Sequence, residues 1–309
     1  WMLGRLNEAL SKYEDAKAIY VEKRNLQGIA KISNNSGIIQ EQKGNLAGAA
    51  GSYREAATVF ERIGDIRSQG FCYGNLATNF ITRGLPNTAR EHIDRTLQLF
   101  EKIGDRGSYT LTIGNLADWY YLIGDNDAAM QVCERTIQLA NELKNEELIC
   151  ETNIRKARLM LMGDTGVAVA LMKSAYEESV EKKWHDLELK AQFCLLEWEI
   201  LSGRYDNRES ALSRLSRLKE KEPPPELICG INKLRGILQY TKDDQKTARI
   251  SFMAAYRIAR KSDLVCDSWE ILSLYGSLWS GYNGPVEKRL RDLELRIFEN
   301  LDERIIRLI

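Results

Sequence analysis

The sequence supplies few of the side chains that catalysis or metal binding requires. Its two histidines, His92 and His185, lie far apart in the chain. A histidine-based metal site or a nucleophile–histidine–acid triad therefore lacks its usual components. The chain also contains no phosphate-binding glycine loop, HExxH or GxSxG motif. We therefore predict a protein that is not an enzyme and that uses no cofactor and no metal ion.

The cysteines are widely spaced and form no CxxC pair. This spacing favours reduced thiols buried as small hydrophobic residues in a cytoplasmic protein. A disulfide framework or a metal cluster is the less favoured alternative. The six residues are Cys72, Cys133, Cys150, Cys194, Cys229 and Cys266.

Three asparagines have the spacing of a binding ladder, because Asn35, Asn75 and Asn115 lie 40 residues apart. An asparagine amide both donates and accepts hydrogen bonds, so such a row can hold the backbone of an extended peptide whatever its sequence. The same asparagines could instead cap or bridge neighbouring helices, and the spacing does not decide between these roles. The other candidate partner-binding residues at helical spacing around them are Lys31, Phe71, Thr78, Leu111 and Asp118. They include no basic cluster, so a clamp for a carboxylate is not predicted.

Helices must position these residues, because the chain repeats with a period of about 40 residues. Gly4, Gly44, Gly84 and Gly124 mark the period, and Gly163 and Gly203 continue it. Small and large, mostly apolar residues follow the first four markers at offsets of 5, 9, 12 and 16, which is one face of an α-helix. In the second period these residues are Ala49, Tyr53, Ala56 and Phe60. A similar apolar face precedes each glycine, so each period is predicted to be a hairpin of helix A followed by helix B.

Glycine and Asp or Asn mark the turns between these helices. Glycine suits the left-handed residue that ends a helix, and Asp or Asn suits the next N-cap. Capping, rather than metal binding, is therefore predicted for the pairs 64–65, 104–105, 124–125 and 163–164. The prolines at 223–225 are predicted to form a stiff connector that stops a helix over 206–221. The predicted A helices cover 28–43, 68–83, 108–123, 147–162, 187–202, 226–241 and 265–280, and the B helices 5–24, 46–63, 86–103, 126–143, 166–183, 206–221, 244–262 and 285–300.

Charge and hydropathy exclude two classes of partner. Lys plus Arg and Asp plus Glu are equal, at 44 each. A balanced chain lacks the basic surface that binds nucleic-acid phosphates or acidic lipid headgroups. No apolar run approaches the roughly 20 residues that span a bilayer, and the start shows no signal-peptide pattern. We therefore expect a cytoplasmic protein without nucleic-acid or membrane partners. Because the chain opens at Trp1 with the repeat already under way, we expect a fragment of a larger protein.

The repeated order Asn-Leu-Ala, Tyr, Gly, Ala, Tyr or Phe, Ala resembles the tetratricopeptide repeat. Residues 73–77 (Tyr-Gly-Asn-Leu-Ala) and 113–117 (Ile-Gly-Asn-Leu-Ala) carry the likeness best. It is strong over 28–145 and weaker beyond, where Arg155, Cys194 and Lys233 interrupt the motif. The usual repeat has 34 residues. The 40-residue period is similar to a long-helix subclass found in polarity adaptors with Leu-Gly-Asn repeats, in bacterial peptide-sensing regulators and in the sensor arms of signalling ATPases.

The resemblance implies an all-α fold, a right-handed superhelical solenoid of antiparallel helical hairpins in which helix A lines the concave side. About seven hairpins, the first truncated, would occupy 1–284. Residues 285–309 would form a capping helix or lead into a following domain. The implied function is a non-catalytic scaffold or sensor module, part of a larger signalling or regulatory protein, that holds a protein or peptide in its concave groove. In polarity adaptors, asparagines at this position hold the peptide.

Two alternatives to a free-standing binding module stay open. The chain could be the regulatory arm of an enzyme, such as a signalling ATPase, kinase or protease, whose catalytic domain lies outside it. Intramolecular contacts with other domains would then be expected. It could also be a small-molecule-sensing solenoid, which would need a closed pocket rather than an open groove.

Overall fold

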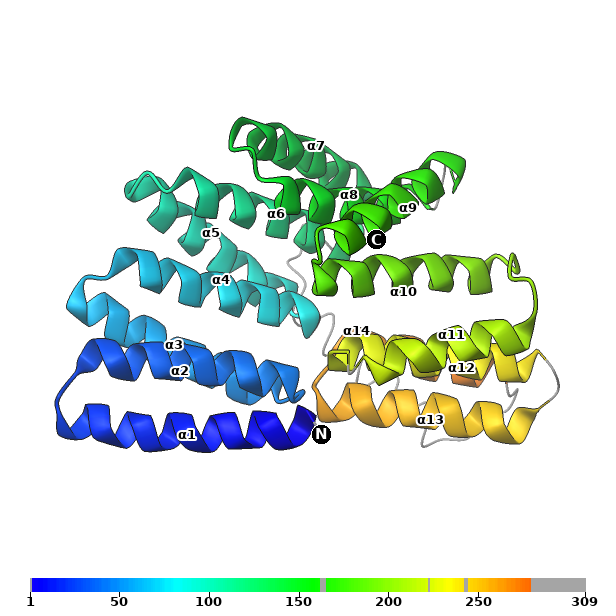
Figure 1. Ribbon diagram of the computed structural model, residues 1–309, viewed down its shortest axis with the longest axis horizontal. Coiled ribbons are helices and arrows are strands. Elements are labelled where there is room, and N and C mark those ends of the chain that lie inside the picture. Colours follow the sequence, from blue (N-terminus) through cyan, green and yellow to red (C-terminus); the bar gives the residue numbers. More distant parts are fainter. Residues whose placement is uncertain (1, 162–164, 222, 242–243, 279–309) are drawn as a thin grey trace.

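All regular secondary structure in the part of the chain that the computed structural model describes, residues 2–161, 165–221, 223–241 and 244–278, is α-helical. Each helix runs antiparallel to the next one along the chain, and the helices form a curved stack (Figure 1). The predicted all-α solenoid of helical hairpins is therefore confirmed. The helices are α1 (Met2–Glu22), α2 (Leu26–Gln42), α3 (Leu46–Ile63), α4 (Ile66–Thr82), α5 (Pro86–Lys102), α6 (Arg106–Leu122), α7 (Asn126–Glu142), α8 (Glu146–Met160), α9 (Thr165–Glu181), α10 (His185–Leu201), α11 (Arg208–Glu220), α12 (Pro225–Tyr240), α13 (Gln245–Lys261) and α14 (Val265–Leu278).

The turns have the predicted chemistry. Gly64 follows α3 with a φ of 74°, and Asp65 then accepts a hydrogen bond from the backbone N–H of Ser68 as the N-cap of α4. These two residues together satisfy backbone groups at the end of one helix and at the start of the next. The same side-chain capping recurs at Asp105, Asp125 and Asn145. The pair at 163–164 lies outside the described residues. Helix α12 begins at Pro225, one residue before the predicted start at 226, so this proline belongs to the first turn of the helix rather than to the connector.

Small residues on the B helices allow neighbouring helices to approach closely. Ala89, five residues after Gly84, is fully buried, as are Ala49 and Ala129 at the same position of the neighbouring repeats. Large apolar residues fill the space beside them, and Tyr53 and Ile93 are likewise fully buried. Close packing of this kind makes each hairpin depend on its neighbours. The result is an apolar core that runs along the stack.

The even-numbered helices lie on the inner side of the curve. Successive members contact one another across repeats, from α4 with α6 through to α12 with α14. The shorter path on the inside of a curved stack brings these helices together. Helix A of each predicted hairpin therefore lines the inner side. No described helix is long and apolar enough to cross a membrane.

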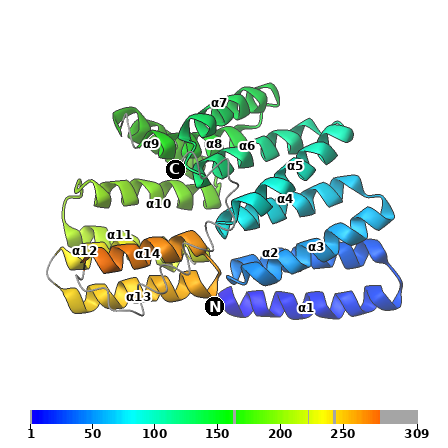
Figure 2. The same cartoon turned by 180° about the vertical axis from the view of Figure 1, so that it is seen from behind.

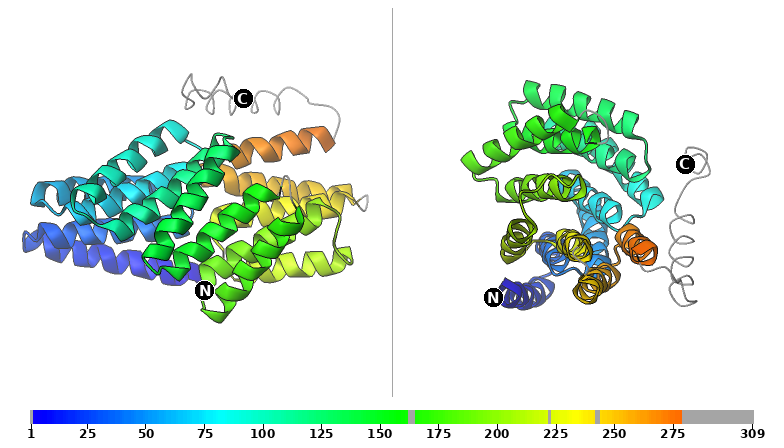
Figure 3. Two further views of the ribbon diagram at one scale, coloured as in Figure 1. Left: turned by 90° about the horizontal axis from the view of Figure 1, so that it is seen from above. Right: turned by 90° about the vertical axis from the view of Figure 1, so that its right-hand side faces the viewer.

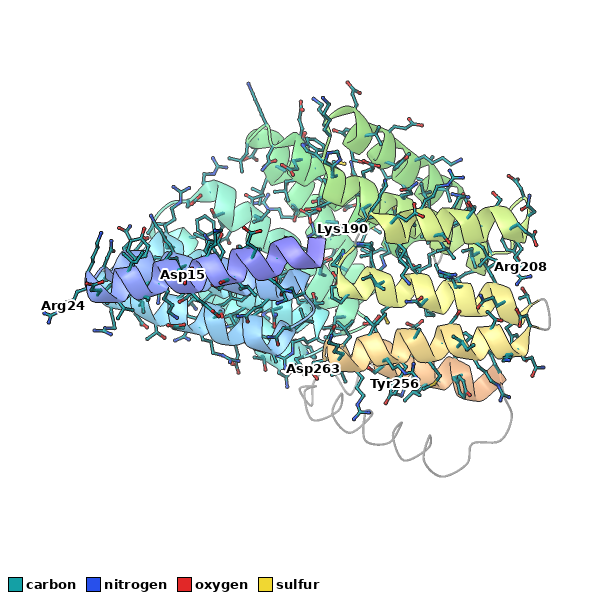
Figure 4. All side chains as sticks on the ribbon, turned by 60° about the horizontal axis from the view of Figure 1, so that its bottom comes forward. Asp15, Arg24, Lys190, Arg208, Tyr256 and Asp263 are labelled. Atoms are coloured by element: carbon teal, nitrogen blue, oxygen red, sulfur yellow. The ribbon has the colours of Figure 1, made fainter. Side chains whose placement is uncertain are left out.

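The two halves of the curved stack meet along a contact that we call the seam. On one side are the turns that follow α2 and α4, and on the other are the start of α12 and the turn between α13 and α14 (Figures 1 and 2). Viewed from above, α1–α4 and α12–α14 extend in opposite directions from this contact (Figure 3). Figure 4 places Asp263 where the halves meet. The solenoid is therefore closed on itself rather than open-ended.

Close approach at the seam requires glycine on the first half. Gly44 and Gly84 have φ values of 78° and 73°, a conformation that ends a helix. A Cβ on Gly44 would lie 2.7 Å from Ser262 Oγ, and a Cβ on Gly84 would lie 2.6 Å from Cys266 Sγ. Side chains at either position would force the halves apart.

Polar and apolar contacts then hold the seam together. Arg83 Nε and Nη2 donate to Asp263 Oδ2 at 3.0 and 2.6 Å, and the Val265 N–H donates to the Arg83 carbonyl at 3.3 Å. Leu46, at the start of α3, packs into an apolar cluster with Phe252 and Leu264 of the second half. The predicted capping or lead-in segment 285–309 lies outside the described residues.

Candidate functional site

The candidate site is the inner surface of the even-numbered helices, which we call the A-face. On helices α2 to α10 it consists of the residues at the fifth, ninth and twelfth positions after the first residue of each helix. All eight residues predicted from the sequence to bind a partner lie on it, on α2, α4 and α6. The A-face residues are Lys31, Asn35, Ile38, Phe71, Asn75, Thr78, Leu111, Asn115, Asp118, Glu151, Arg155, Arg158, Lys190, Cys194 and Glu197.

The asparagines differ in how far their amides are already used. Asn75 Nδ2 donates to Asn34 Oδ1 at 3.1 Å, so this residue bridges α4 to α2. Asn115 Nδ2 lies 3.5 Å from Thr78 Oγ1, a long contact at an exposed position. Asn35 is exposed, and within the described chain it forms no hydrogen bond with its side chain. Bridging therefore accounts for Asn75, whereas Asn35 and Asn115 keep most of their hydrogen-bonding capacity.

Each of the first three even-numbered helices also exposes a large apolar side chain on the A-face. Ile38 is 40%, Phe71 43% and Leu111 45% exposed. Phe71 is held by a tilted contact with the Phe100 ring, whose centroid lies 5.3 Å away. These side chains gain free energy when another apolar group covers them. Together with the open amides, they can hold an extended chain that carries apolar side chains.

The A-face changes from amide and apolar groups to charged groups between α6 and α8. Arg155 occupies the position of the asparagines, and its guanidinium contacts Asp118 of α6 at 2.9 Å and Glu151 at 3.0 Å. Glu151 also lies 3.6 Å from Lys190 of α10. These ion pairs join three successive helices across the inner side of the curve.

A second charged network continues the first. Lys233 of α12 lies 3.5 Å from Glu197 of α10 and 2.9 Å from Glu270 of α14. Burial lowers the pKa of the Lys233 ammonium, but the two carboxylates outweigh it and the pKa is raised overall. Lys233 is therefore held in its charged form.

The expectation of no basic cluster concerned the candidate residues on the first three A helices, and basic residues follow further along the A-face. Arg155, Arg158 and Lys190 all lie on this face, on α8 and α10. The sequence pattern did not identify them as binding residues, because Arg155, Cys194 and Lys233 interrupt the repeat motif. The 40-residue step from Asn115 to Arg155 was the signal that could have found them.

Arg158 differs from the other cations of the A-face. Its guanidinium carbon lies 4.7 Å from the centroid of the Tyr121 ring, and both side chains are exposed. Among the described residues no carboxylate lies within ion-pair distance of Arg158. The carboxylate of Asp118 contacts Arg155 instead, and that of Glu197 contacts Lys233.

Two acidic side chains, Glu226 in the first turn of α12 and Asp267 in the first turn of α14, have raised pKa values. Burial raises the pKa of Glu226, and the neighbouring charges of Asp267 and Glu41 add to this effect. Burial raises the pKa of Asp267 to about 6, while Lys233 opposes and Glu270 reinforces the shift. Both carboxyl groups are therefore protonated at a higher pH than ordinary acidic side chains.

The described residues outside the A-face offer little chemistry. The ring of His92 stacks between Tyr73 and Phe80, and burial lowers its pKa to about 4. His185 is exposed on α10. No described group of three or more His, Cys, Asp or Glu side chains could hold a metal ion. Burial raises the pKa of the Cys72 thiol to about 12 and keeps it protonated, as expected for a core cysteine.

Comparisons with known proteins support the fold. No protein-family model and no curated protein matches the sequence. A solved Rap protein complexed with competence and sporulation factor matches with a TM-score of 0.68 at 15% identity, over 96% of this chain and 87% of that one. The apo form of RapI matches with a TM-score of 0.55 at 11% identity, over 82% of this chain and 98% of that one.

A third similarity is to a signal transduction ATPase with a tetratricopeptide repeat sensor from Pyrococcus horikoshii. Its TM-score is 0.49 at 14% identity, over 91% of this chain and 45% of that one, which is too low to support an inference. At these identities the Rap structures establish the architecture alone. The chain is an all-α solenoid of helical repeats, which is consistent with the resemblance of its sequence to the tetratricopeptide repeat.

Proposed function

We propose that the chain is a non-catalytic binding module that holds an extended protein segment on its A-face. The observation that carries the proposal is the coincidence of open asparagine amides on α2 and α6 with exposed apolar side chains on α2, α4 and α6. The amides would pair with the partner's backbone, and Phe71 and Leu111 would cover its apolar side chains. A Rap protein of similar fold has been solved in complex with competence and sporulation factor, which supports a binding role for this fold.

The spacing of the A-face suits an extended chain. Neighbouring packed helices lie roughly 10 Å apart, and an extended peptide advances about 3.3 Å per residue. Asn35, Asn75 and Asn115 would therefore meet the partner backbone at about every third residue. Asn75 would do so with the oxygen that its contact to Asn34 leaves free.

The experiment is an affinity selection from a library of random linear seven-residue peptides, with the immobilised chain as bait. The triple variant Asn35→Ala, Asn75→Ala, Asn115→Ala should bind the selected peptides at least tenfold more weakly, because each lost amide leaves a peptide group unpaired at a cost of roughly 1–3 kcal/mol. The matched control is Asn126→Ala, Asn141→Ala, which removes two exposed asparagines from α7.

Melting curves separate binding from folding. The triple variant loses one bridge, between Asn75 and Asn34, so its free energy of unfolding should fall by about 1 kcal/mol. A large fall in melting temperature with unchanged affinity per folded molecule would make the asparagines structural bridges. The roles of regulatory arm and fragment of a larger signalling protein, and the cytoplasmic location, stay predictions from the sequence.

A further inference from the structure

On α6, α8 and α10 the charged side chains of the A-face are all in ion pairs except one cation. Asp118, Glu151, Glu197 and Glu270 each lie within 4 Å of a cation, and Arg155, Lys190 and Lys233 each lie within 4 Å of a carboxylate. Arg158 is the exception among these described side chains, and it lies on α8 at the same helical position as Asp118 on α6 and Glu197 on α10. A ligand amine would have to displace a protein cation, whereas a ligand carboxylate could approach Arg158 directly.

The contact with Tyr121 prepares Arg158 for this interaction. The guanidinium lies over the ring, 4.7 Å from its centroid. A guanidinium that stacks through its face keeps its N–H groups in the plane, where they can form two parallel hydrogen bonds with a carboxylate. The stack also limits the rotamers of a long side chain, so less conformational entropy is lost when a ligand binds.

We propose that Arg158 binds a carboxylate of the ligand and thereby selects an acidic extended peptide. This inference rests on the proposed function, that is, on peptide binding at the A-face. The carboxylate is either the free C-terminus or the side chain of Asp or Glu, and both present the same two oxygens. The same peptide places an apolar side chain against Leu111 or Phe71.

Helix geometry sets the distance between these two contacts. Arg158 lies seven helical positions further along its helix than Leu111 does along α6, which is about 10 Å of rise. The step to the neighbouring helix adds roughly 10 Å sideways. The diagonal of about 14 Å corresponds to about four residues of an extended peptide. A ligand with a carboxylate about four residues from an apolar side chain would reach both sites.

The test uses two libraries of random linear seven-residue peptides in affinity selection. One contains Asp and Glu and ends in a free carboxylate. The other omits Asp and Glu and ends in an amide. We expect binders from the first library alone, with at least tenfold weaker binding to Arg158→Gln. Arg158→Lys keeps the charge without the planar fork, so its loss should be intermediate.

Arg204→Gln is the matched control, because Arg204 is also exposed and stacks on an aromatic ring, 5.3 Å from the centroid of Trp198, but lies off the A-face. The affinity of Arg204→Gln for the selected peptides should be within twofold of that of the parent protein. Melting curves of all variants confirm that they are folded. Binding that depends on a carboxylate and on Arg158, but not on Arg204, supports the proposal.

The remaining outcomes separate this proposal from the proposed function. Peptides that come equally from both libraries and bind Arg158→Gln unchanged, but lose affinity for the triple asparagine variant, would overturn the role of Arg158 alone. Selection of no peptide, or of peptides indifferent to both the asparagines and Arg158, would overturn both proposals.

Discussion

Arg83 and Asp263 form a hydrogen-bonded ion pair across 180 residues of sequence. The pair is mostly shielded from solvent, with side-chain exposures of 14% and 29%. It connects the turn after α4 to the turn before α14, so its energy contributes to closure of the solenoid rather than to any single hairpin.

We expect Arg83→Gln and Asp263→Asn each to lower the free energy of unfolding by about 2 kcal/mol, because each leaves a partly buried charge without its partner. The double variant should cost little more than either single one, giving a coupling energy of about 1–2 kcal/mol in a double-mutant cycle. Chemical denaturation of the four proteins measures it. Additive effects would show that the two side chains do not interact in solution.

Ala89→Arg should unfold the protein or lower its stability by more than about 3 kcal/mol, because Ala89 is fully buried between helices and the new charge would be buried with it. Ala47→Arg is the matched control, since Ala47 is exposed in the first turn of another B helix. Thermal melting compares the two. Equal melting temperatures would mean that the repeat register is misassigned.

Arg155→Met should destabilise the fold by about 2 kcal/mol, because it leaves Asp118 and Glu151 without the guanidinium that joins them. Arg158→Gln is the natural comparison, since Arg158 on the same helix is exposed and in the described chain forms no ion pair. Its melting temperature should stay close to that of the parent. A reversed order would contradict the assignment of structural and ligand-binding arginines.

His92 should make the protein sensitive to mild acid. Its pKa falls from 6.5 in the unfolded chain to about 4 in the fold, because burial and the nearby charges of Arg54 and Arg95 disfavour the imidazolium. The stability that depends on neutral His92 is complete above pH 6.5 and is lost as the pH falls toward 4. His92→Phe keeps the stacking without the titration, so its melting temperature should fall less than that of the parent over this range. His185→Gln serves as the control for removing an exposed histidine.

Asp267 should give the protein a pH dependence of stability opposite to that of His92. Its pKa is raised from 3.8 to about 6, so the fold favours the protonated form and gains stability from this group as the pH falls through 6 toward 3.8. Asp267→Asn should therefore melt higher than the parent at pH 8, with a gap that closes below pH 6. Asp127→Asn removes an acidic residue from the first turn of another helix, where the helix dipole favours it, and should lower stability slightly. A parent that melts higher than Asp267→Asn at pH 8 would refute this assignment.

Local sequence signals predicted the repeats well. Gly64 with Asp65, and buried alanines such as Ala89, act within one hairpin or between neighbours, so their spacing identifies the helices and their packed faces. The first half of the A-face followed from the same spacing, because Asn75 and Asn115 repeat the same residue type. The family resemblance placed that row on the inner side.

Two features could not be predicted in this way. The charged half of the A-face changes residue type from Asn115 to Arg155 and then to Cys194, so a search for repeated identity stops there even though the position is kept. The seam depends on the small rotation between successive hairpins, summed around the whole curve. The sequence around Arg83 or Asp263 does not indicate this total rotation, since the two residues meet only after the intervening repeats have stacked.

The seam also turns the number of repeats into a geometric constraint. An open solenoid can lose or gain a hairpin and simply become shorter or longer. Here, removal of the repeat α7–α8 (residues 126–160) would rotate everything after it by one repeat's angle and carry Asp263 away from Arg83. The same rotation would leave Gly44 and Gly84 facing solvent instead of the second half. Closure therefore ties the copy number of the hairpins to the curvature of each one, so that neither can change without the other.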